Sequence, residues 1–208
     1  MRPFIHVNCA MSADGKIAGV ERTQVRISNE EDMLRAKELR RRYNAILAGV
    51  GTITADDPHL TIKGASAEEN PVRIIIDPKG RTPKDAQAVD DRATTLILTE
   101  DGCTEEWKNA YIIECGKPFD LTAAMRHLAD WGIENMLVEG GGKTIASFFE
   151  KNIVDRYTVF IGAMIIGGKD APTPADGNGW VAENGLKMRL KNAEILGDGV
   201  LLTYEAIR

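Results

Sequence analysis

The run Leu137–Thr144, LVEGGGKT, contains three consecutive glycines followed by lysine and threonine. This pattern is similar to the end of a phosphate-binding loop, in which backbone amides surround the phosphates of a nucleotide. The complete motif, G-x-x-x-x-G-K-[ST], requires an earlier glycine five residues before the second one. With Gly142 as the second glycine, that position holds Leu137, and Glu139 adds a carboxylate where phosphate oxygens would crowd. The spacing therefore argues against a nucleotide-hydrolysing loop.

The dinucleotide fingerprint G-x-G-x-x-G also fails here, because counting from Gly140 places its third glycine at Ile145. What remains is a strand-like run that enters glycines and then a helix-like segment. The free amides and the dipole of a helix amino-terminus favour an anion, and glycines let the backbone approach a pyrophosphate closely. The alternative is a tight turn without a ligand. Because three consecutive glycines cost conformational entropy, we favour a pyrophosphate site.

A second candidate is the segment 49–61, GVGTITADDPHLT, which leaves an apolar run through two glycines. Thr52 and Asp56 are one helical turn apart, so both would lie on one helix face and could hydrogen-bond a ligand. The alternative is a helix with acidic residues that ends at the proline of Asp57-Pro58. Nearby, Arg40 begins a run of three arginines. Such runs usually form a solvated helix face, although arginine also suits a substrate phosphate.

Composition narrows the class of protein. The 208 residues carry a formal net charge of −5, which argues against nucleic acid or an anionic membrane as partner but allows a local basic pocket. The three cysteines and three histidines have no spacing typical of a disulfide framework or a metal site, so no metal is expected. There is no membrane-length apolar run and no signal peptide. We expect a soluble, cytoplasmic, single-domain protein spanning residues 1–208.

Strand-like and helix-like segments alternate along the chain, which predicts an α/β fold with a mostly parallel central sheet and helices on both faces. A final hairpin around Gly197-Asp198-Gly199 adds antiparallel strands, so the sheet is mixed. Ser28 and Glu31 are spaced as a capping box at the start of the first helix. The strands are expected at 4–11, 45–49, 72–77, 94–99, 110–114 and 135–139, with helices at 28–44, 104–108, 121–131 and 143–152. The run 156–168, RYTVFIGAMIIGG, is expected to be a strand that continues into a glycine-rich loop.

Five segments taken together resemble the pyrimidine reductases of riboflavin biosynthesis, including the reductase half of the bifunctional deaminase–reductase. They are MSADGKIA, LRRRYNAILAGVGTITADDPHLT, VRIIIDPKGRTP, LVEGGGKTIASFF and VDRYTVFIGAMIIGG, and they occur in the family's order from residue 4 to about 168. The resemblance implies a dihydrofolate-reductase-like fold and a homodimer. It also implies NADPH-dependent reduction of a phosphorylated ribosylaminopyrimidine to its ribitylamino counterpart.

The resemblance also implies roles for individual residues. Glu139 matches a substrate contact, where its carboxylate could accept hydrogen bonds from amino groups of the pyrimidine. Arg40 and Lys63 are the expected partners of the substrate phosphate, and Gln24 and Leu60 align with other substrate-side positions. The expected NADPH-binding residues are Met11, Arg26, Thr52, Asp56, Pro78, Gly141, Gly142, Lys143, Thr144, Ile145, Ala146 and Ser147.

Three departures from the family pattern bear on the cofactor and the substrate. Asn8 stands where the bifunctional enzymes carry a lysine, as in the archaeal and fungal stand-alone branch. Pro78 stands where a serine often touches NADP, so only a backbone or packing contact could form there. The zinc signature of the deaminase, H-x-E with P-C-x-x-C, is absent from the sequence. The branch resemblance therefore predicts a stand-alone reductase that acts before deamination, on the 2,5-diamino substrate.

In the implied reaction NADPH delivers hydride to the ribose C1, with the sugar ring opened to an imine. Ring opening requires proton transfer, for which Asp57, Glu139 and water are the candidates. The alternatives are reduction of the deaminated 5-amino-6-ribosylaminouracil 5′-phosphate, or reduction of another pterin or pyrimidine by a dihydrofolate-reductase-like enzyme. A non-catalytic NADP-binding regulatory domain is the alternative from another class.

Overall fold

The computed structural model describes residues 1–23 and 25–207, and it divides into two compact units that interleave along the chain. The first unit comprises Met1–Phe4 and Leu39–Val138, and the second comprises Ile5–Glu38 and the residues from Glu139 onward. The sequence prediction of a single domain stays a prediction.

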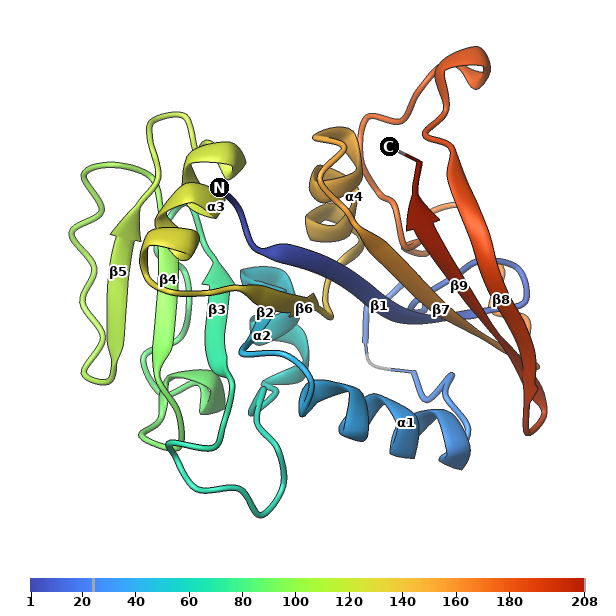
Figure 1. Cartoon of the computed structure of the whole chain (residues 1–208), viewed down its shortest axis with the longest axis horizontal. Coiled ribbons are helices and arrows are strands. Elements are labelled where there is room, and N and C mark those ends of the chain that lie inside the picture. The colour runs from blue at the N-terminus through green and yellow to red at the C-terminus, as the bar shows by residue number, and fades with distance from the viewer. Residues whose placement is uncertain (24, 208) are drawn as a thin grey trace. The chain divides into compact units, whose positions relative to one another are not determined.

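The first unit is built on a parallel sheet of five strands in the order β5-β4-β3-β2-β6 (Figure 1). Two of these strands, β2 and β4, are buried at every position, which explains why their sequences are apolar runs without alternation. The bounds are β2 Ala45–Gly49, β3 Val72–Ile76, β4 Thr95–Thr99, β5 Ala110–Glu114 and β6 Asn135–Val138, with α2 at Val50–Asp56, η1 at Gln87–Val89 and α3 at Leu121–Asp130.

The core of the first unit places α2 against one face of this sheet. Val50 and Ile53 of α2 pack with Ile46, Ile75 and Ile97, which come from three neighbouring strands. Helix α3 contributes none of its buried residues to this cluster and covers the other face, in front of β3 and β4 in Figure 1. The helices thus follow the parallel strands in the manner that the alternating sequence predicted.

One polar side chain lies inside this core. Arg73 of β3 is fully buried, and its Nε donates to Thr95 Oγ1 at 2.9 Å. Its Nη1 contacts Asp90 Oδ1 at 2.7 Å, and its Nη2 donates to the carbonyl of Ala93 at 2.6 Å. A buried guanidinium requires such a complete set of acceptors. Arg73 therefore holds the segment that ends at Ala93 against the sheet.

The second unit combines parallel and antiparallel pairing. Strand β1 is parallel to β7, β7 is antiparallel to β9, and β9 is antiparallel to β8 (Figure 1). The predicted C-terminal hairpin is confirmed, with its turn at Gly197 and Asp198. The bounds are β1 Phe4–Ser12, β7 Arg156–Gly162, β8 Met188–Leu196 and β9 Gly199–Ala206, with α1 at Glu30–Arg40, α4 at Gly142–Glu150 and η2 at Ala182–Asn184.

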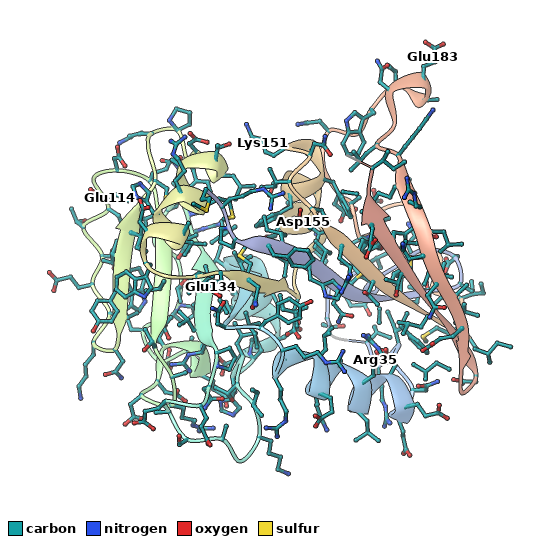
Figure 2. The ribbon with its side chains drawn as sticks, in the orientation of Figure 1. Arg35, Glu114, Glu134, Lys151, Asp155 and Glu183 are labelled. Carbon is teal, nitrogen blue, oxygen red and sulfur yellow. The ribbon has the colours of Figure 1, made fainter. Side chains whose placement is uncertain are left out.

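Asp155 connects the strands of this second unit, just before β7 begins (Figure 2). Its Oδ2 accepts from the amide of Ile5 at 2.8 Å, and its amide donates to the carbonyl of the same residue at 2.9 Å. Its own carbonyl accepts from Ala206 N at 3.0 Å. With 6% exposure, this aspartate fixes the register of β1 and β9 relative to β7.

The predicted capping box at the start of the first helix is wrong. Asn29 provides the cap, because its Oδ1 accepts from the amide of Asp32 at 2.9 Å. Ser28 instead donates from its hydroxyl to Asp32 Oδ2 at 2.5 Å. The side-chain nitrogen Nδ2 of Asn29 also donates to Leu196 O and to Asp198 Oδ1. These hydrogen bonds connect the start of the helix to the hairpin turn. These contacts between distant segments decide the cap, and local spacing does not contain them.

The predicted short helix at Thr104–Lys108 is also wrong, since these residues form no helix in the structure. Trp107 is 7% exposed, and its Nε1 donates to the carbonyl of Thr82 at 3.1 Å. Lys84 stacks over the Trp107 ring and pairs with Glu105. Burial of one aromatic ring against a neighbouring loop therefore overrides the weak local helix preference of this segment.

Within residues 1–23 and 25–207 no helix is both long and apolar enough to cross a membrane.

His6 of β1 is 3% exposed, and its Nε2 is hydrogen-bonded to Thr158 Oγ1. Burial, reinforced by the charges of Arg156 and Arg35, lowers the pKa of His6 to about 3. Between the ordinary histidine pKa of about 6.5 and this value, the unfolded chain binds a proton that the folded protein does not. Stability should therefore be complete above about pH 6.5 and fall as the pH drops toward 3.

We predict that His6→Gln makes the free energy of unfolding less sensitive to acid. This group alone should contribute a slope of up to about 1.4 kcal/mol per pH unit in that window. Urea unfolding at a series of pH values measures the slope. His127→Gln, on an exposed position of α3, is the matched control and should keep the original slope. An unchanged slope in His6→Gln would show that the buried imidazole is not the source.

Candidate functional site

The glycine turn after β6 leads directly into α4. Gly141 is the N-cap residue, with φ of 77°, and no side chain caps the helix. No acidic residue occupies the first turn, where Lys143 is exposed and adds positive charge. An uncapped helix amino-terminus with these properties offers backbone amides and a favourable dipole to an anion. The arrangement fits the pyrophosphate of a dinucleotide.

The predicted cofactor residues of α4 differ in what they can offer a ligand. Ile145 and Ala146 are 1% and 2% exposed, so their side chains belong to the core and only their backbone could contribute. The Ser147 hydroxyl donates to the carbonyl of Thr144 at 2.6 Å. Lys143 and Thr144 are the more exposed members of the first turn. Few side chains at the start of α4 can therefore contact a ligand, and the backbone amides are the main groups available to it.

Gly142 has a structural reason to be glycine. A Cβ at this position would lie 2.1 Å from the carbonyl oxygen of Thr173 and 3.0 Å from Asp176 Oδ2. The segment 173–176 is held here because Asp176 N donates to Gly142 O at 3.2 Å, and Thr173 N donates to Asp176 Oδ1 at 2.9 Å. Part of the long Gly/Pro-rich loop thus packs on the start of α4. Close packing, and not only a ligand, accounts for one of the three glycines.

The segment MSADG, at the end of β1, is ordered by its aspartate. Asp14 Oδ1 accepts from Ser12 Oγ at 2.6 Å and from Ile166 N at 3.1 Å, and Oδ2 accepts from Gly167 N at 2.7 Å. These hydrogen bonds, from Ser12 first and then from the two amides, lower the pKa of Asp14 to about 2. The sequence alone suggested only a turn here. In the structure, Asp14 connects the MSADG segment, which includes Met11, to the glycine-containing loop after β7.

Thr52 and Asp56 lie on α2, as the segment after β2 predicted. Partial burial raises the pKa of Asp56 above its ordinary value. Asp57 ends the helix with φ of 40°, and its carboxylate accepts from Gln87 N at 2.8 Å and from Gln87 Nε2 at 3.1 Å. These hydrogen bonds give Asp57 a role in holding the loop at η1.

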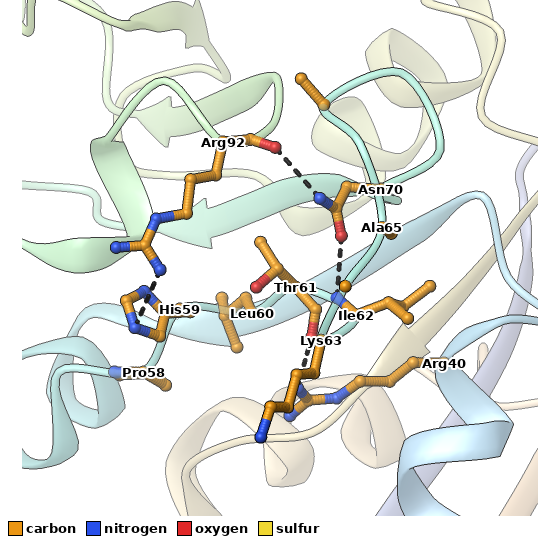
Figure 3. A pocket seen from close by; sticks show the side chains of 12 residues that line it. Arg40, Pro58, His59, Leu60, Thr61, Ile62, Lys63, Ala65, Asn70 and Arg92 are labelled. Carbon is orange, nitrogen blue, oxygen red and sulfur yellow. Dashed lines mark hydrogen bonds between the residues drawn. The ribbon is translucent and has the colours of Figure 1, made fainter.

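A basic pocket of about 590 Å³ follows α2 in the first unit (Figure 3). It brings together three predicted substrate residues, Arg40, Leu60 and Lys63. Arg40 Nη1 donates to the carbonyl of Thr61 at 3.0 Å, which holds the guanidinium at the pocket wall. Leu60 is 2% exposed and has φ of 50°, so its side chain fills the core while its backbone faces the pocket in a conformation that is uncommon for leucine.

The remaining predicted site residues are distributed over both units. Pro78 follows β3, and its carbonyl accepts from Glu100 N at 3.0 Å. Met11 is the penultimate residue of β1, and Arg26 is an exposed residue that pairs loosely with Glu30 at 4.0 Å. The predicted substrate residue Gln24 lies outside the described residues. The first unit holds Arg40, Thr52, Asp56, Asp57, Leu60, Lys63 and Pro78, and the second holds Met11, Arg26, Glu139 and Gly141–Ser147.

Several residues near these sites were missed by sequence reasoning. His59 and Arg92 line the basic pocket, and Asp14 holds two loops together. The sequence contains His59 beside the recognised Asp57-Pro58, but it offers no signal for Arg92, which comes from a loop 32 residues after Leu60 in the chain. In the described part of the chain no three His, Cys, Asp or Glu residues are grouped as metal ligands would be.

The architecture corresponds to a known class of enzyme. The reductase part of a deaminase/reductase from Thermotoga maritima superposes with a TM-score of 0.85 at 26% identity, over 99% of this chain and 57% of that one. The yeast riboflavin biosynthesis reductase Rib7 shares the fold, with a TM-score of 0.78 at 19% identity, over 99% of this chain and 90% of that one. The fold is therefore the α/β, dihydrofolate-reductase-like fold of the pyrimidine reductases.

The chain belongs to the RibD C-terminal domain family, which matches residues 3–202. It is 37% identical to a 2,5-diamino-6-ribosylamino-4(3H)-pyrimidinone 5′-phosphate reductase of Archaeoglobus fulgidus, with 98% of each chain aligned. It is 36% identical to the protein of the same name in Methanothermobacter thermautotrophicus, again over 98% of both. A riboflavin biosynthesis protein RibD of Aquifex aeolicus is 33% identical over 98% of this chain and 58% of its own length. Membership of this reductase family implies a nicotinamide cofactor.

Asn8, one of the departures from the bifunctional pattern, has a clear structural context. It is 7% exposed on β1, and its Oδ1 accepts from Arg35 Nη2 at 2.9 Å. Arg35 projects from α1 (Figure 2) and also pairs with Asp32 at 2.7 Å. A lysine at position 8 would place a second buried cation beside this guanidinium. The identity of residue 8 is thus coupled to Arg35.

We predict that Gly142→Ala destabilises the protein by about 1–3 kcal/mol, because the new methyl group would meet the Thr173 carbonyl and displace the 173–176 segment. Gly51→Ala is the matched control. Gly51 also lies in a helix, a Cβ there meets nothing within 4 Å, and alanine should stabilise the protein by about 0.5–1 kcal/mol. Denaturant unfolding of both variants measures the two opposite changes. A neutral Gly142→Ala would mean that the segment moves away from α4 at no cost.

Proposed function

We propose that this protein reduces 2,5-diamino-6-ribosylamino-4(3H)-pyrimidinone 5′-phosphate to the ribitylamino product with NADPH, in riboflavin biosynthesis. The observation that carries this proposal is the full-length similarity to two archaeal proteins named as that reductase. The structure supports it with a pocket rich in cations, suited to a substrate phosphate, and with an uncapped helix amino-terminus, suited to a cofactor pyrophosphate.

When bound, the nicotinamide cofactor supplies the hydride that reduces the ribose C1. The chain's own residues bind and orient the reactants. Arg40 and Lys63 hold the substrate phosphate, and the carboxylate of Glu139 accepts hydrogen bonds from amino groups of the pyrimidine. Opening of the sugar ring needs a proton transfer, for which Glu139, Asp57 and water are the candidates.

The cofactor preference for NADPH over NADH follows from the family resemblance. The basic residues Lys79 and Arg81 follow β3 and could be partners of its 2′-phosphate, but both face carboxylates. Lys79 pairs with Glu100, and Arg81 lies 3.9 Å from Asp77 Oδ1. We therefore assign neither of them to the cofactor.

The deaminated 5-amino-6-ribosylaminouracil 5′-phosphate is the alternative substrate, since RibD relatives are 33% identical to this chain. The buried Asn8–Arg35 contact favours the diamino substrate, because the bifunctional pattern has a lysine at position 8. The decisive assay follows NADPH absorbance with each pyrimidine in parallel. Faster turnover of the diamino compound supports the proposal, and exclusive turnover of the deaminated compound overturns the substrate assignment.

The same assay separates the other hypotheses. A reductase for a different pterin or pyrimidine would oxidise NADPH with neither compound but with another member of a substrate panel. A non-catalytic NADP-binding domain would bind the cofactor and oxidise it with none.

We further propose a cytoplasmic homodimer. In support of the cytoplasmic location, the three cysteines are free in the structure. In support of the dimer, the apolar side chains of Leu190 and Ile195 on β8 are exposed at 53% and 84%.

We predict that Lys143→Glu changes stability and cofactor affinity in opposite directions. An acidic residue in the first turn of α4 should stabilise the helix by about 0.3–1 kcal/mol. The same charge should repel the pyrophosphate and raise the dissociation constant of NADPH on the order of tenfold. Fluorescence titration with NADPH and NADH, together with thermal unfolding, measures both effects.

Lys151→Glu provides the matched control, because it reverses the same charge at the other end of α4 (Figure 2). Its dissociation constant for NADPH should equal that of the unaltered protein. Equal affinities in both variants would remove α4 as the pyrophosphate site.

We predict that Glu139→Gln lowers the turnover number by about 100-fold or more while leaving NADPH binding nearly intact. The amide keeps the size of the side chain but loses one acceptor and the ability to transfer a proton. Glu134→Gln, at an exposed position just before β6 (Figure 2), is the control and should keep full activity. If Glu139→Gln lost cofactor affinity and turnover to the same degree, its assigned role on the substrate side would be refuted.

A further inference from the structure

The basic pocket of the first unit contains one positively charged residue in addition to Arg40 and Lys63, which are already assigned to the substrate. It is lined by Arg40, Lys63 and Arg92, and none of its lining residues is an aspartate or glutamate. The whole chain, by contrast, carries a formal net charge of −5. Three cations around one cavity of about 590 Å³ without a carboxylate on its wall create a local positive potential that favours an anionic ligand.

Arg92 is held in place by its neighbours at this wall (Figure 3). Its Nη1 contacts His59 Nε2 at 3.2 Å, and its Nε lies 3.0 Å from Asp90 Oδ2. Its carbonyl accepts from Asn70 Nδ2 at 3.1 Å, and the same Asn70 side chain accepts from Ile62 N at 2.8 Å. Nη2 makes no hydrogen bond with any described residue. The guanidinium is therefore oriented through two of its nitrogens and keeps a third for a ligand.

The support for Arg92 extends into the core of the unit. Asp90, which orients the guanidinium, is itself contacted at 2.7 Å by Arg73, the fully buried arginine of β3. A sheet strand thus fixes the carboxylate, and the carboxylate fixes the pocket cation. Side chains that are locked in this way bind a ligand with less loss of conformational freedom than a mobile surface arginine would. With two arginines around one aspartate, the group keeps a net positive charge.

We propose that Arg92, oriented by Asp90 and His59, is a specificity-determining residue that binds the phosphate end of the substrate together with Arg40 and Lys63. This inference rests on the proposed function and adds a third cation to the phosphate subsite. Arg92 would make the enzyme discriminate between the phosphorylated pyrimidine and its dephosphorylated form. An arginine fork also compensates for Lys63, which offers a point charge where the family often has arginine.

The test compares Arg92→Gln with Arg126→Gln, an exposed arginine on α3 that lies outside the pocket. For the phosphorylated substrate, Arg92→Gln should raise KM on the order of tenfold with little change in kcat. For the dephosphorylated substrate, the two variants should have the same KM. Arg92→Lys keeps the charge but loses the fork, so its KM should lie between those of the unaltered protein and Arg92→Gln.

Calorimetric titration with ribose 5-phosphate separates this inference from the proposed function. If the protein turns over the pyrimidine phosphate but Arg92→Gln behaves as Arg126→Gln does, the inference is overturned and the function stands. If neither pyrimidine is reduced but Arg92→Gln weakens ribose 5-phosphate binding, the phosphate subsite stands and the function fails. If turnover is absent and binding is unaffected, both fail. Arg92→Lys decides the question if Arg92→Gln does not fold.

Discussion

A buried guanidinium organises the first unit and, through it, the basic pocket. Arg73 is fully enclosed, so all of its donors need acceptors inside the protein, and it takes them from β4 and from the loop that ends at Ala93. The same requirement fixes Asp90 at the surface end of this network. Asp90 then orients Arg92. The hydrogen bonding required by the buried Arg73 therefore determines the position of a cation in the pocket.

At the start of α4, in the second unit, two neighbouring glycines have different surroundings. Gly141 has a positive φ and leaves the start of α4 without a side-chain cap, which suits an anion. Gly142, directly after it, is constrained by the carbonyl of Thr173. Gly141 and Gly142 are therefore glycine for different structural reasons, although the sequence shows them as one motif. The distinction matters for experiments, because a bulky residue at Gly142 affects folding before it affects any ligand.

Asn8 and Lys63 illustrate how the two candidate substrates could be told apart by chemistry. Asn8 is compatible with Arg35 because an amide oxygen accepts what a lysine would oppose. At position 63, a lysine offers charge without the bidentate geometry of arginine. Asn8 is buried on β1, whereas Lys63 belongs to the loop that lines the basic pocket. The fold itself is shared with relatives of lower identity.

The sequence by itself determined the alternation of buried strands and helices, the closing hairpin, and the sequence family, because each of these depends on local pattern or on ordered motifs. It also pointed to Arg40, Leu60 and Lys63, which line one pocket in the structure. Tertiary structure alone decided the contacts of Asn29 with the hairpin turn, the non-helical path around Trp107, and the position of Arg92 beside His59. Each of these depends on contacts between residues far apart in the chain, and such contacts leave no signal in a single sequence.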